Sequence, residues 1–170
     1  MTLYACSGQD PNTYHWAIIV GPKEEVEGGR AYRYHARQRV DPARPGRIIW
    51  VPVYESLEIP LVQTTMLLGR IMIAKVTCNS AQLHSTLAAV PIVQDDSSWT
   101  CRIWVKDAIA ALEADRKSLG TQITDWTTIE QTANNYIEQK RQQRRYDGSG
   151  SWVPGTVPTF DLLENQETVP

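Results

Sequence analysis

Two hydrophobic patterns divide the chain, one after the other. In the first half, short apolar runs rich in β-branched and aromatic residues are separated by Gly, Pro and Asp, which is typical of strands and turns. From about residue 80 onward, apolar residues recur every three or four positions, which is typical of helices that pack on one side. Strands followed by helices predict the α+β class, with an antiparallel β-sheet packed against helices.

The strand pattern is clearest in the sequence YHWAIIVG at 14–21, which ends in Gly21-Pro22 and predicts a buried strand. Pro52 indicates an edge or a bulge near the end of one run, and Gly69 indicates a bend in another. We expect strands at 3–6, 14–21, 31–38, 47–54 and 64–76, with the second and third forming a hairpin.

Three helices are predicted, each after a residue that can cap its first turn. Ser80 can cap the first helix, Ser98 or Thr100 the second, and Asp125 the third. The second helix has its apolar residues at 101, 104, 105, 108, 109 and 112, which is the spacing of a stripe that faces the core.

The chain is predicted to form one domain with a tail. With 170 residues it is long enough for a single core, which we place at residues 1–146. Residues 147–170 contain Gly, Ser, Pro and acidic side chains but no basic one, so we expect a mobile tail that Trp152 and Phe160 could attach to the body. The 42 % apolar content and the net charge of -2 are typical of a globular protein.

Location and partners follow from further features of the composition. The first ten residues lack a basic segment followed by an apolar run, and no apolar stretch is long enough to span a bilayer. The three cysteines cannot form a complete set of disulfides. We therefore expect a soluble cytoplasmic protein with reduced thiols and no membrane partner.

Two basic clusters change the picture given by the near-zero net charge. Six arginines lie between Arg30 and Arg47 against a single acid, Asp41, and a second cluster runs from Lys140 to Arg145. Both can be solvated surface, and the second also suits the negative end of a helix dipole. Both can equally be a face that binds phosphate, carboxylate or the RNA backbone, since guanidinium groups bind such anions well. A tRNA partner is therefore one expectation.

Cys101 is the first candidate for chemistry. It opens the second predicted helix, where unbonded N–H groups and the helix dipole lower the pKa of a thiol and favour the nucleophilic thiolate. It also shares the apolar stripe with Trp104 and Val105, and a buried, inert cysteine is common in such a place. Both readings remain open from the residues alone.

His15 and His35 are the candidates for the base that a nucleophilic thiol needs. His15 begins the strand at 14–21 and His35 lies on the strand at 31–38, so the two become neighbours if these strands form a hairpin. Alternation places His15, Ala17 and Ile19 on one face, and we expect that face to meet the Cys101 helix because Ala17 leaves room for it. Single histidines on strands are also commonly structural.

The residues 14–112 resemble a known group of enzymes. The strand YHWAIIVG, a second histidine on the next strand and a cysteine that opens a downstream helix resemble the circularly permuted papain-like thiol enzymes, which include the lecithin:retinol acyltransferase-like and NlpC/P60-like families. The segment 99–112 is also similar to uncharacterised small fungal proteins. The resemblance implies a permuted papain-like arrangement, with Cys101 as the nucleophile, His15 as the general base and His35 as the residue that orients it.

This chain departs from the acyltransferases in two ways. They usually have Asn-Cys where this chain has Thr100-Cys101, and they have a hydrophobic C-terminal anchor that this sequence lacks. A membrane phospholipid is therefore not the expected substrate.

The predicted function is thiol-dependent acyl transfer. Cys101 would form an acyl-thioester from a small acyl or amide substrate, and water or an amine would accept the acyl group. One alternative is an aminoacyl-tRNA-dependent cyclodipeptide synthase of the fungal, arginine-containing type, and another is a non-catalytic binding module on the same fold. No cofactor is expected, and the Cys and His spacing fits no metal site.

Three arginines are the candidate substrate ligands. Alternation on the strand at 31–38 places Arg33, His35 and Arg37 on one face, and Arg39 extends the row. Such a row would favour an anionic substrate. The alternative is that this face is open to solvent, with Tyr32 and Tyr34 in the core and His35 on the surface.

Overall fold

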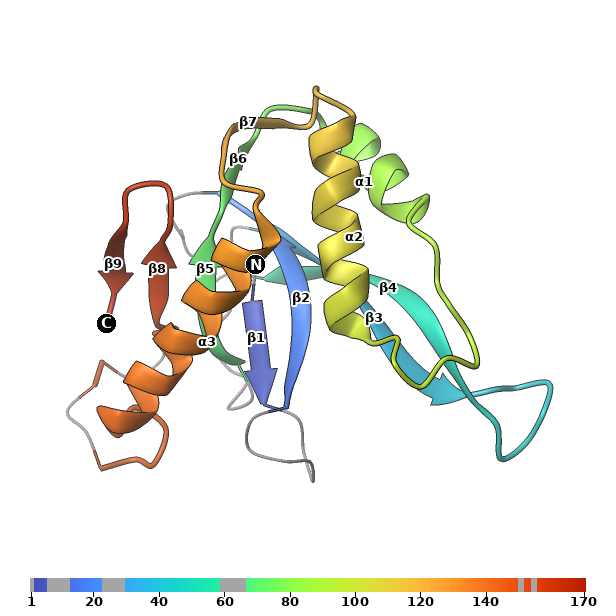
Figure 1. Cartoon of the computed structure of the whole chain (residues 1–170), viewed down its shortest axis with the longest axis horizontal. Coiled ribbons are helices and arrows are strands. Elements are labelled where there is room, and N and C mark those ends of the chain that lie inside the picture. The colour runs from blue at the N-terminus through green and yellow to red at the C-terminus, as the bar shows by residue number, and fades with distance from the viewer. Residues whose placement is uncertain (1, 6–12, 23–29, 59–66, 150–151, 154–155) are drawn as a thin grey trace.

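The computed structural model describes residues 2–5, 13–22, 30–58, 67–149, 152–153 and 156–170. Nine strands and three helices are described in that part of the chain (Figure 1). In chain order they are β1 (Thr2–Ala5), β2 (Tyr14–Val20), β3 (Arg30–Val40), β4 (Ile48–Glu58), β5 (Leu67–Met72), β6 (Ala74–Val76), α1 (Ser80–Ala88), α2 (Cys101–Ala114), β7 (Leu119–Gln122), α3 (Trp126–Gln142), β8 (Thr159–Asp161) and β9 (Gln166–Val169).

Seven of these strands form one sheet in the order β4-β3-β2-β1-β5-β8-β9, and β6 and β7 form a separate pair. The neighbours in the large sheet are antiparallel except β5 and β8, which are parallel. The predicted α+β class is thus confirmed, although one strand pair departs from the expected antiparallel pattern. The expected strand at 64–76 is divided into β5 and β6, and its first three residues lie outside the described ranges.

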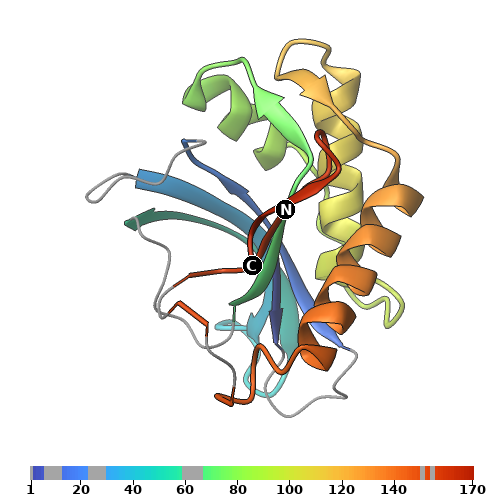
Figure 2. The same cartoon turned by 90° about the vertical axis from the view of Figure 1, so that its left-hand side faces the viewer.

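The three helices gather on one side of the large sheet (Figure 2). Trp16 of β2 contacts Trp126 at the start of α3, with ring centroids 5.5 Å apart, and Tyr34 and Tyr54 contact His84 of α1. Gly69 is needed where β5 meets α3, since a Cβ there would lie 2.7 Å from Cδ1 of Ile137. The large core cluster lies between this face of the sheet and the helices.

Most of the helix features that the sequence predicts are confirmed. The six apolar positions predicted for α2 are all buried, with Trp104 and Val105 fully so. Asp125 caps α3 by accepting a hydrogen bond from the backbone N–H of Thr128, and Asn79, one residue before the predicted Ser80, caps α1. Thr100 precedes α2 without a capping hydrogen bond from its side chain.

The prediction of a mobile tail from 147 to 170 is wrong for residues 156–170. This segment supplies β8, which pairs with β5, and β9, which pairs with β8. Val157 and Leu162 are buried, and the ring of Phe160 packs against Tyr136 of α3. The local composition is that of a loop, but pairing with a distant strand and burial of two apolar side chains outweigh it.

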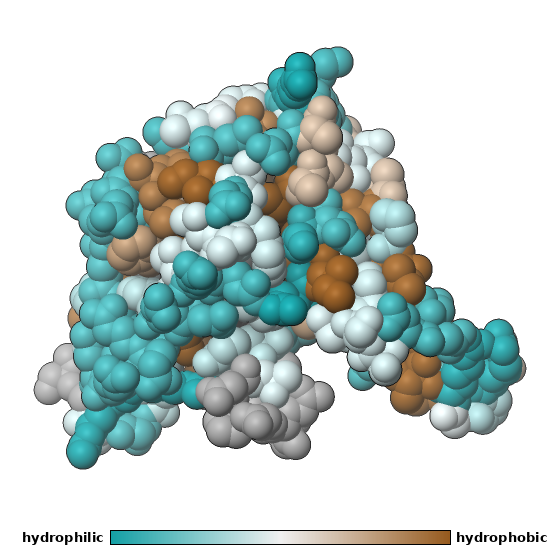
Figure 3. Space-filling view, in the orientation of Figure 1, coloured by the Kyte–Doolittle hydropathy of each residue, from teal (hydrophilic) through white to brown (hydrophobic). Residues whose placement is uncertain are grey.

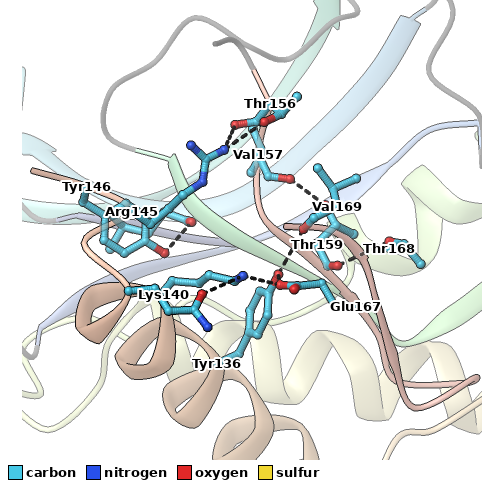
Figure 4. Close-up of polar contacts among 12 residues, drawn as sticks. Tyr136, Lys140, Arg145, Tyr146, Thr156, Val157, Thr159, Glu167, Thr168 and Val169 are labelled. Carbon is cyan, nitrogen blue, oxygen red and sulfur yellow. Dashed lines mark hydrogen bonds and ion pairs between the residues drawn. The ribbon is translucent and has the colours of Figure 1, made fainter. Parts of the chain in front are cut away.

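The basic end of α3 holds that C-terminal segment in place (Figure 4). Lys140 is only 1 % exposed, its Nζ lies 2.5 Å from Oε1 of Glu167, and the rings of Tyr136 and Trp152 flank it. Arg145 donates to the carbonyl and hydroxyl oxygens of Thr156. Lys140 and Arg145, two residues of the basic cluster for which a tRNA partner is expected, thus make contacts within the fold.

The face shown in Figure 3 is largely hydrophilic, and its apolar side chains form separate patches. Val40 and Ile48, on the β3–β4 hairpin, are the most exposed large apolar side chains after Val153 in the described ranges. Within those ranges, no helix has both the length and the apolar character that a membrane crossing requires.

Candidate active site

The two predicted histidines are in direct contact. Nε2 of His15 lies 2.6 Å from Nδ1 of His35, and the rings meet edge to face with centroids 4.8 Å apart. The expectation that β2 and β3 form a hairpin that makes these residues neighbours is confirmed.

The contact lies where β2 and β3 part. Their backbone register covers Ile18 to Val20 on β2 and Tyr34 to Tyr32 on β3, so His15 and His35 lie just beyond the paired residues. From that point β2 continues beside β1, whereas β3 continues beside β4 (Figure 1). The imidazole pair therefore bridges two strands whose backbones are separating.

Burial sets the protonation state of the pair. His35 is 5 % exposed and His15 is half-buried. The pKa of His15 is lowered to about 4, mainly by burial and also by the positive charge of Arg33, while Glu55 opposes both effects. Burial also lowers the pKa of His35 to about 4, with smaller contributions from His15 and Arg33. Both rings are therefore neutral near pH 7, which is the state in which an imidazole can accept a proton.

Glu55 is a site residue that the sequence reasoning missed. Its Oε1 lies 3.9 Å from Nε2 of His35, and its Oε2 accepts from Nε of Arg33 at 2.9 Å and from Nη2 of the same side chain. Burial raises the pKa of Glu55, but the hydrogen bond and charge of Arg33 outweigh it, so the pKa lies below its usual value. The position of Glu55 could have been predicted from the register of β3 and β4, which pairs Arg33 with Glu55. That register, however, depends on the turn at 41–46.

The three predicted substrate arginines differ in their surroundings. Arg33 is half-buried and bound to Glu55, whereas Arg37 and Arg39 are exposed. The charge of Arg37 acts on both His35 and Glu55, so Arg37 shares their site as the alternation predicts. His35 and Tyr34 are both buried, so the alternative that His35 is an ordinary surface residue is wrong.

Cys101 is the first residue of α2, as predicted, and is 7 % exposed. It belongs to the same core cluster as Trp16 and Ala36, the residues that directly follow His15 and His35 in the chain. The helix packs against both β2 and β3. Cys101 is thus buried on the side of the sheet that the helix covers.

The expected route from the thiol to the imidazole needs correction. Trp16 and Ile18 lie in the helix-side core, but Ala17 packs with Leu67 and Val157 in a separate cluster. The helix therefore does not pack on Ala17, and alternation turns the His15 side chain to the face opposite Trp16. The core contacts and the alternation of β2 therefore put the His15 ring and the Cys101 helix on opposite faces of β2, so the expectation that the face of His15 meets this helix is wrong.

Two cavities in the described part of the structure provide space for ligands. The larger, about 550 Å³, lies near the end of α2 opposite Cys101 and includes Ile109 and Leu112 in its wall. The smaller, about 460 Å³, is lined by Tyr34, Tyr54, Glu55 and His84, so it borders the histidine site through Glu55. Among the described residues, no group of three or more His, Cys, Asp or Glu side chains could hold a metal ion.

Comparison with known proteins gives one match, which covers nearly the whole chain. The profile of a family described as a family of unknown function (DUF6914) matches residues 1–169. None of the curated proteins and none of the solved structures matches the chain.

Proposed function

The chain belongs to the DUF6914 family, whose description supplies no activity, and we propose from the site itself that the protein is a thiol-dependent acyl-transfer enzyme. In this proposal Cys101 is the nucleophile, His15 is the general base and His35 orients His15. Because alternation turns His15 away from α2, the proposal requires its ring to reach the sulfur past the side of β2 that faces β3. The observation that carries it is the 2.6 Å contact between Nε2 of His15 and Nδ1 of His35. A base that is fixed by a third group is what a thiol nucleophile requires.

The position of Cys101 adds support. Its backbone lies in the first turn of a 14-residue helix, where N–H groups lack partners within the helix and the dipole is positive. Negative charge on the sulfur, and later on the carbonyl oxygen of a bound substrate, is stabilised at such a place. The backbone N–H of Cys101 is then the first donor of an oxyanion hole.

The proposed reaction has two halves. The sulfur of Cys101 attacks a carbonyl carbon while His15 takes the thiol proton, and the tetrahedral oxyanion collapses by expelling the leaving group, which receives that proton. The enzyme is left as a thioester. Water or an amine then attacks the thioester carbonyl, His15 removes its proton, and the departing sulfur regains a proton as the acyl product leaves.

The low pKa of His15 favours one version of this chemistry. An imidazole with a pKa of about 4 is neutral at pH 7, so a thiolate–imidazolium pair is not the resting form of the site. In the proposal the proton moves to His15 as the sulfur attacks. Such general-base catalysis typically contributes 10²–10⁴-fold to the rate.

An activated ester tests the proposal without knowledge of the natural substrate. Native protein mixed with p-nitrophenyl acetate should release about one equivalent of p-nitrophenolate in a burst, and mass spectrometry should locate the acetyl group on Cys101. Cys101→Ser and His15→Ala should each suppress the burst, whereas His84→Gln, which changes an exposed histidine of α1, should retain it. Acetylation elsewhere, or a full burst in Cys101→Ser, would contradict the nucleophile assignment.

The nature of the acyl donor follows less directly. An aminoacyl-tRNA donor would need a basic surface, and the exposed Arg37 and Arg39 are the candidates nearest the histidine pair. The same two side chains suit a small carboxylate or phosphate equally well. We propose a small anionic acyl donor, because it needs no binding surface beyond these two residues. If the p-nitrophenolate burst is absent, the protein is a binding module without catalysis.

A further inference from the structure

We propose that Glu55 is a positioning residue that sets the direction of proton transfer through the histidine pair by selecting the tautomer of His35. This inference rests on the proposed function for its consequence, but the tautomer itself can be observed separately. The residues involved form a line from Arg33 through Glu55 and His35 to His15.

The first step is the orientation of the Glu55 carboxylate. Arg33 donates from both Nε and Nη2 to the same oxygen, Oε2. Both donors hold Oε2, and the other oxygen, Oε1, lies 3.9 Å from Nε2 of His35. The negative charge of Glu55 is thus held next to one nitrogen of the His35 ring.

The second step is the choice of tautomer. Nε2 of His35 is buried and has no hydrogen-bond partner among the residues that the structure describes, so the nearest charge decides which form is favoured. A proton on Nε2 points its positive end at Glu55, whereas a lone pair there would face a negative oxygen. The Nε2–H form is therefore favoured, and Nδ1 of His35 is left as an acceptor.

The third step transfers this choice to His15. An acceptor at Nδ1 of His35, 2.6 Å from Nε2 of His15, requires that Nε2 of His15 carries the proton. The lone pair of His15 is then on Nδ1, the nitrogen that is not engaged with His35. That nitrogen is the one able to take a proton from a thiol.

The opposite tautomer would disable the base. If Nδ1 of His35 carried the proton, it would donate to Nε2 of His15, and the remaining proton of neutral His15 would occupy Nδ1. A thiol facing that nitrogen would meet a donor in place of an acceptor. Glu55 thus acts at a distance from the reaction, through two imidazole rings.

The charged groups that act on His35 support Glu55 as the group that selects its tautomer. Arg33, Arg37 and His15 each oppose a positive charge on His35, and Glu55 is the group that favours it. Glu55 is also the acid bound to Arg33, so the two cations and the acid form one electrostatic unit with the histidine pair.

Long-range ¹H–¹⁵N spectra of the full chain labelled at histidine nitrogens test the inference. In the unmodified protein at pH 7, His35 and His15 should both show the pattern of the Nε2–H tautomer. In Glu55→Gln the His35 signal should move toward the Nδ1–H pattern, and Glu55→Asp should retain the original pattern at least in part. Asp95→Asn, which removes the carboxylate bound to Arg47 on another part of the surface, is the matched control and should change neither ring.

The outcomes separate the two proposals. An Nδ1–H pattern for His35 in the unmodified protein overturns the role of Glu55, whether or not the variants fold, and so does an unchanged tautomer in folded Glu55→Gln. If the tautomer shifts as expected, the p-nitrophenolate burst rate should fall about tenfold or more in Glu55→Gln. A shifted tautomer with an unchanged burst rate supports Glu55 as the selector and contradicts His15 as the base.

Discussion

Nε2 of His15 and Nδ1 of His35 lie 2.6 Å apart, although the residues are 20 positions apart in the chain and their strands are already separating. Neighbouring strands alone do not bring two rings this close. The pair is buried, neutral at pH 7 and backed by Glu55 and Arg33. Such an arrangement fixes one ring through the other, which is why we treat His15 as a base and His35 as its support.

Replacement of His35 tests that support. His35→Leu should slow the p-nitrophenolate burst about 10- to 100-fold, because His15 loses the acceptor that fixes its proton. His35→Gln should retain more of the rate, since its amide oxygen can accept the same hydrogen bond. An equal burst rate in the unmodified protein and His35→Leu would show that His35 does not orient the base.

The same histidines should make stability depend on pH. The pKa of each is about 4 in the folded protein and about 6.5 in an unfolded chain, so only the unfolded chain binds these protons between those values. Their contribution to stability is complete above pH 6.5 and is lost as the pH falls toward 4; a shift of this size corresponds to about 3 kcal/mol for a single histidine.

Urea unfolding at pH 7 and pH 4.5 measures that loss. A variant with His15→Gln and His35→Gln should lose much less stability between these two values of pH than the unmodified protein. His84→Gln, which changes an exposed histidine of α1, should lose as much as the unmodified protein. An identical loss in the double variant would assign the pH dependence to other groups.

The predictability of this site differs from residue to residue. The helix stripe and the place of Cys101 in its first turn follow from local spacing, which the structure confirms. That His15 and His35 lie near one another follows once the hairpin is assumed, but their direct contact does not, because it lies outside the paired residues. Glu55 was missed because its position opposite Arg33 is set by the register of β3 and β4, which the alternation of neither strand specifies alone.

The C-terminal segment shows the same limit in the fold. Its composition is that of a loop, and its three-residue strand β8 is too short to give a period. It is ordered by partners distant in sequence, namely β5 and the buried Lys140. Information of that kind is not present in the segment itself.

Lys140 and Glu167 should therefore be coupled in stability. Glu167→Gln leaves the buried ammonium group of Lys140 without its counterion and should cost about 1–3 kcal/mol, since Glu167 is partly exposed and the pair is not fully desolvated. Lys140→Met combined with Glu167→Gln should cost less than the sum of the two changes. Additive losses in a double-mutant cycle of urea unfolding would show that the ion pair is not what attaches β9 to α3.

Trp104 and Cys101 should separate stability from activity within one helix. Trp104 is fully buried, so Trp104→Ala should cost roughly 3–5 kcal/mol through the cavity that it leaves. Cys101→Ala removes one sulfur from the first residue of the helix. It should lower the free energy of unfolding by about 1 kcal/mol and should abolish the acetylation burst. Chemical unfolding and the burst assay on the same samples check both. A burst that persists in Cys101→Ala, or collapse of the fold on that change alone, would contradict the assignment.

The most direct test of the account compares two thiols of the native protein. Cys101 is buried and Cys78 is more exposed, so exposure alone predicts that iodoacetamide labels Cys78 first. The account predicts the reverse at pH 7 by mass spectrometry, and a fall of at least tenfold in Cys101 labelling in His15→Ala with Cys78 labelling unchanged. Faster labelling of Cys78 in the unmodified protein, together with no effect of His15→Ala on Cys101, would contradict the proposal that Cys101 is an activated nucleophile.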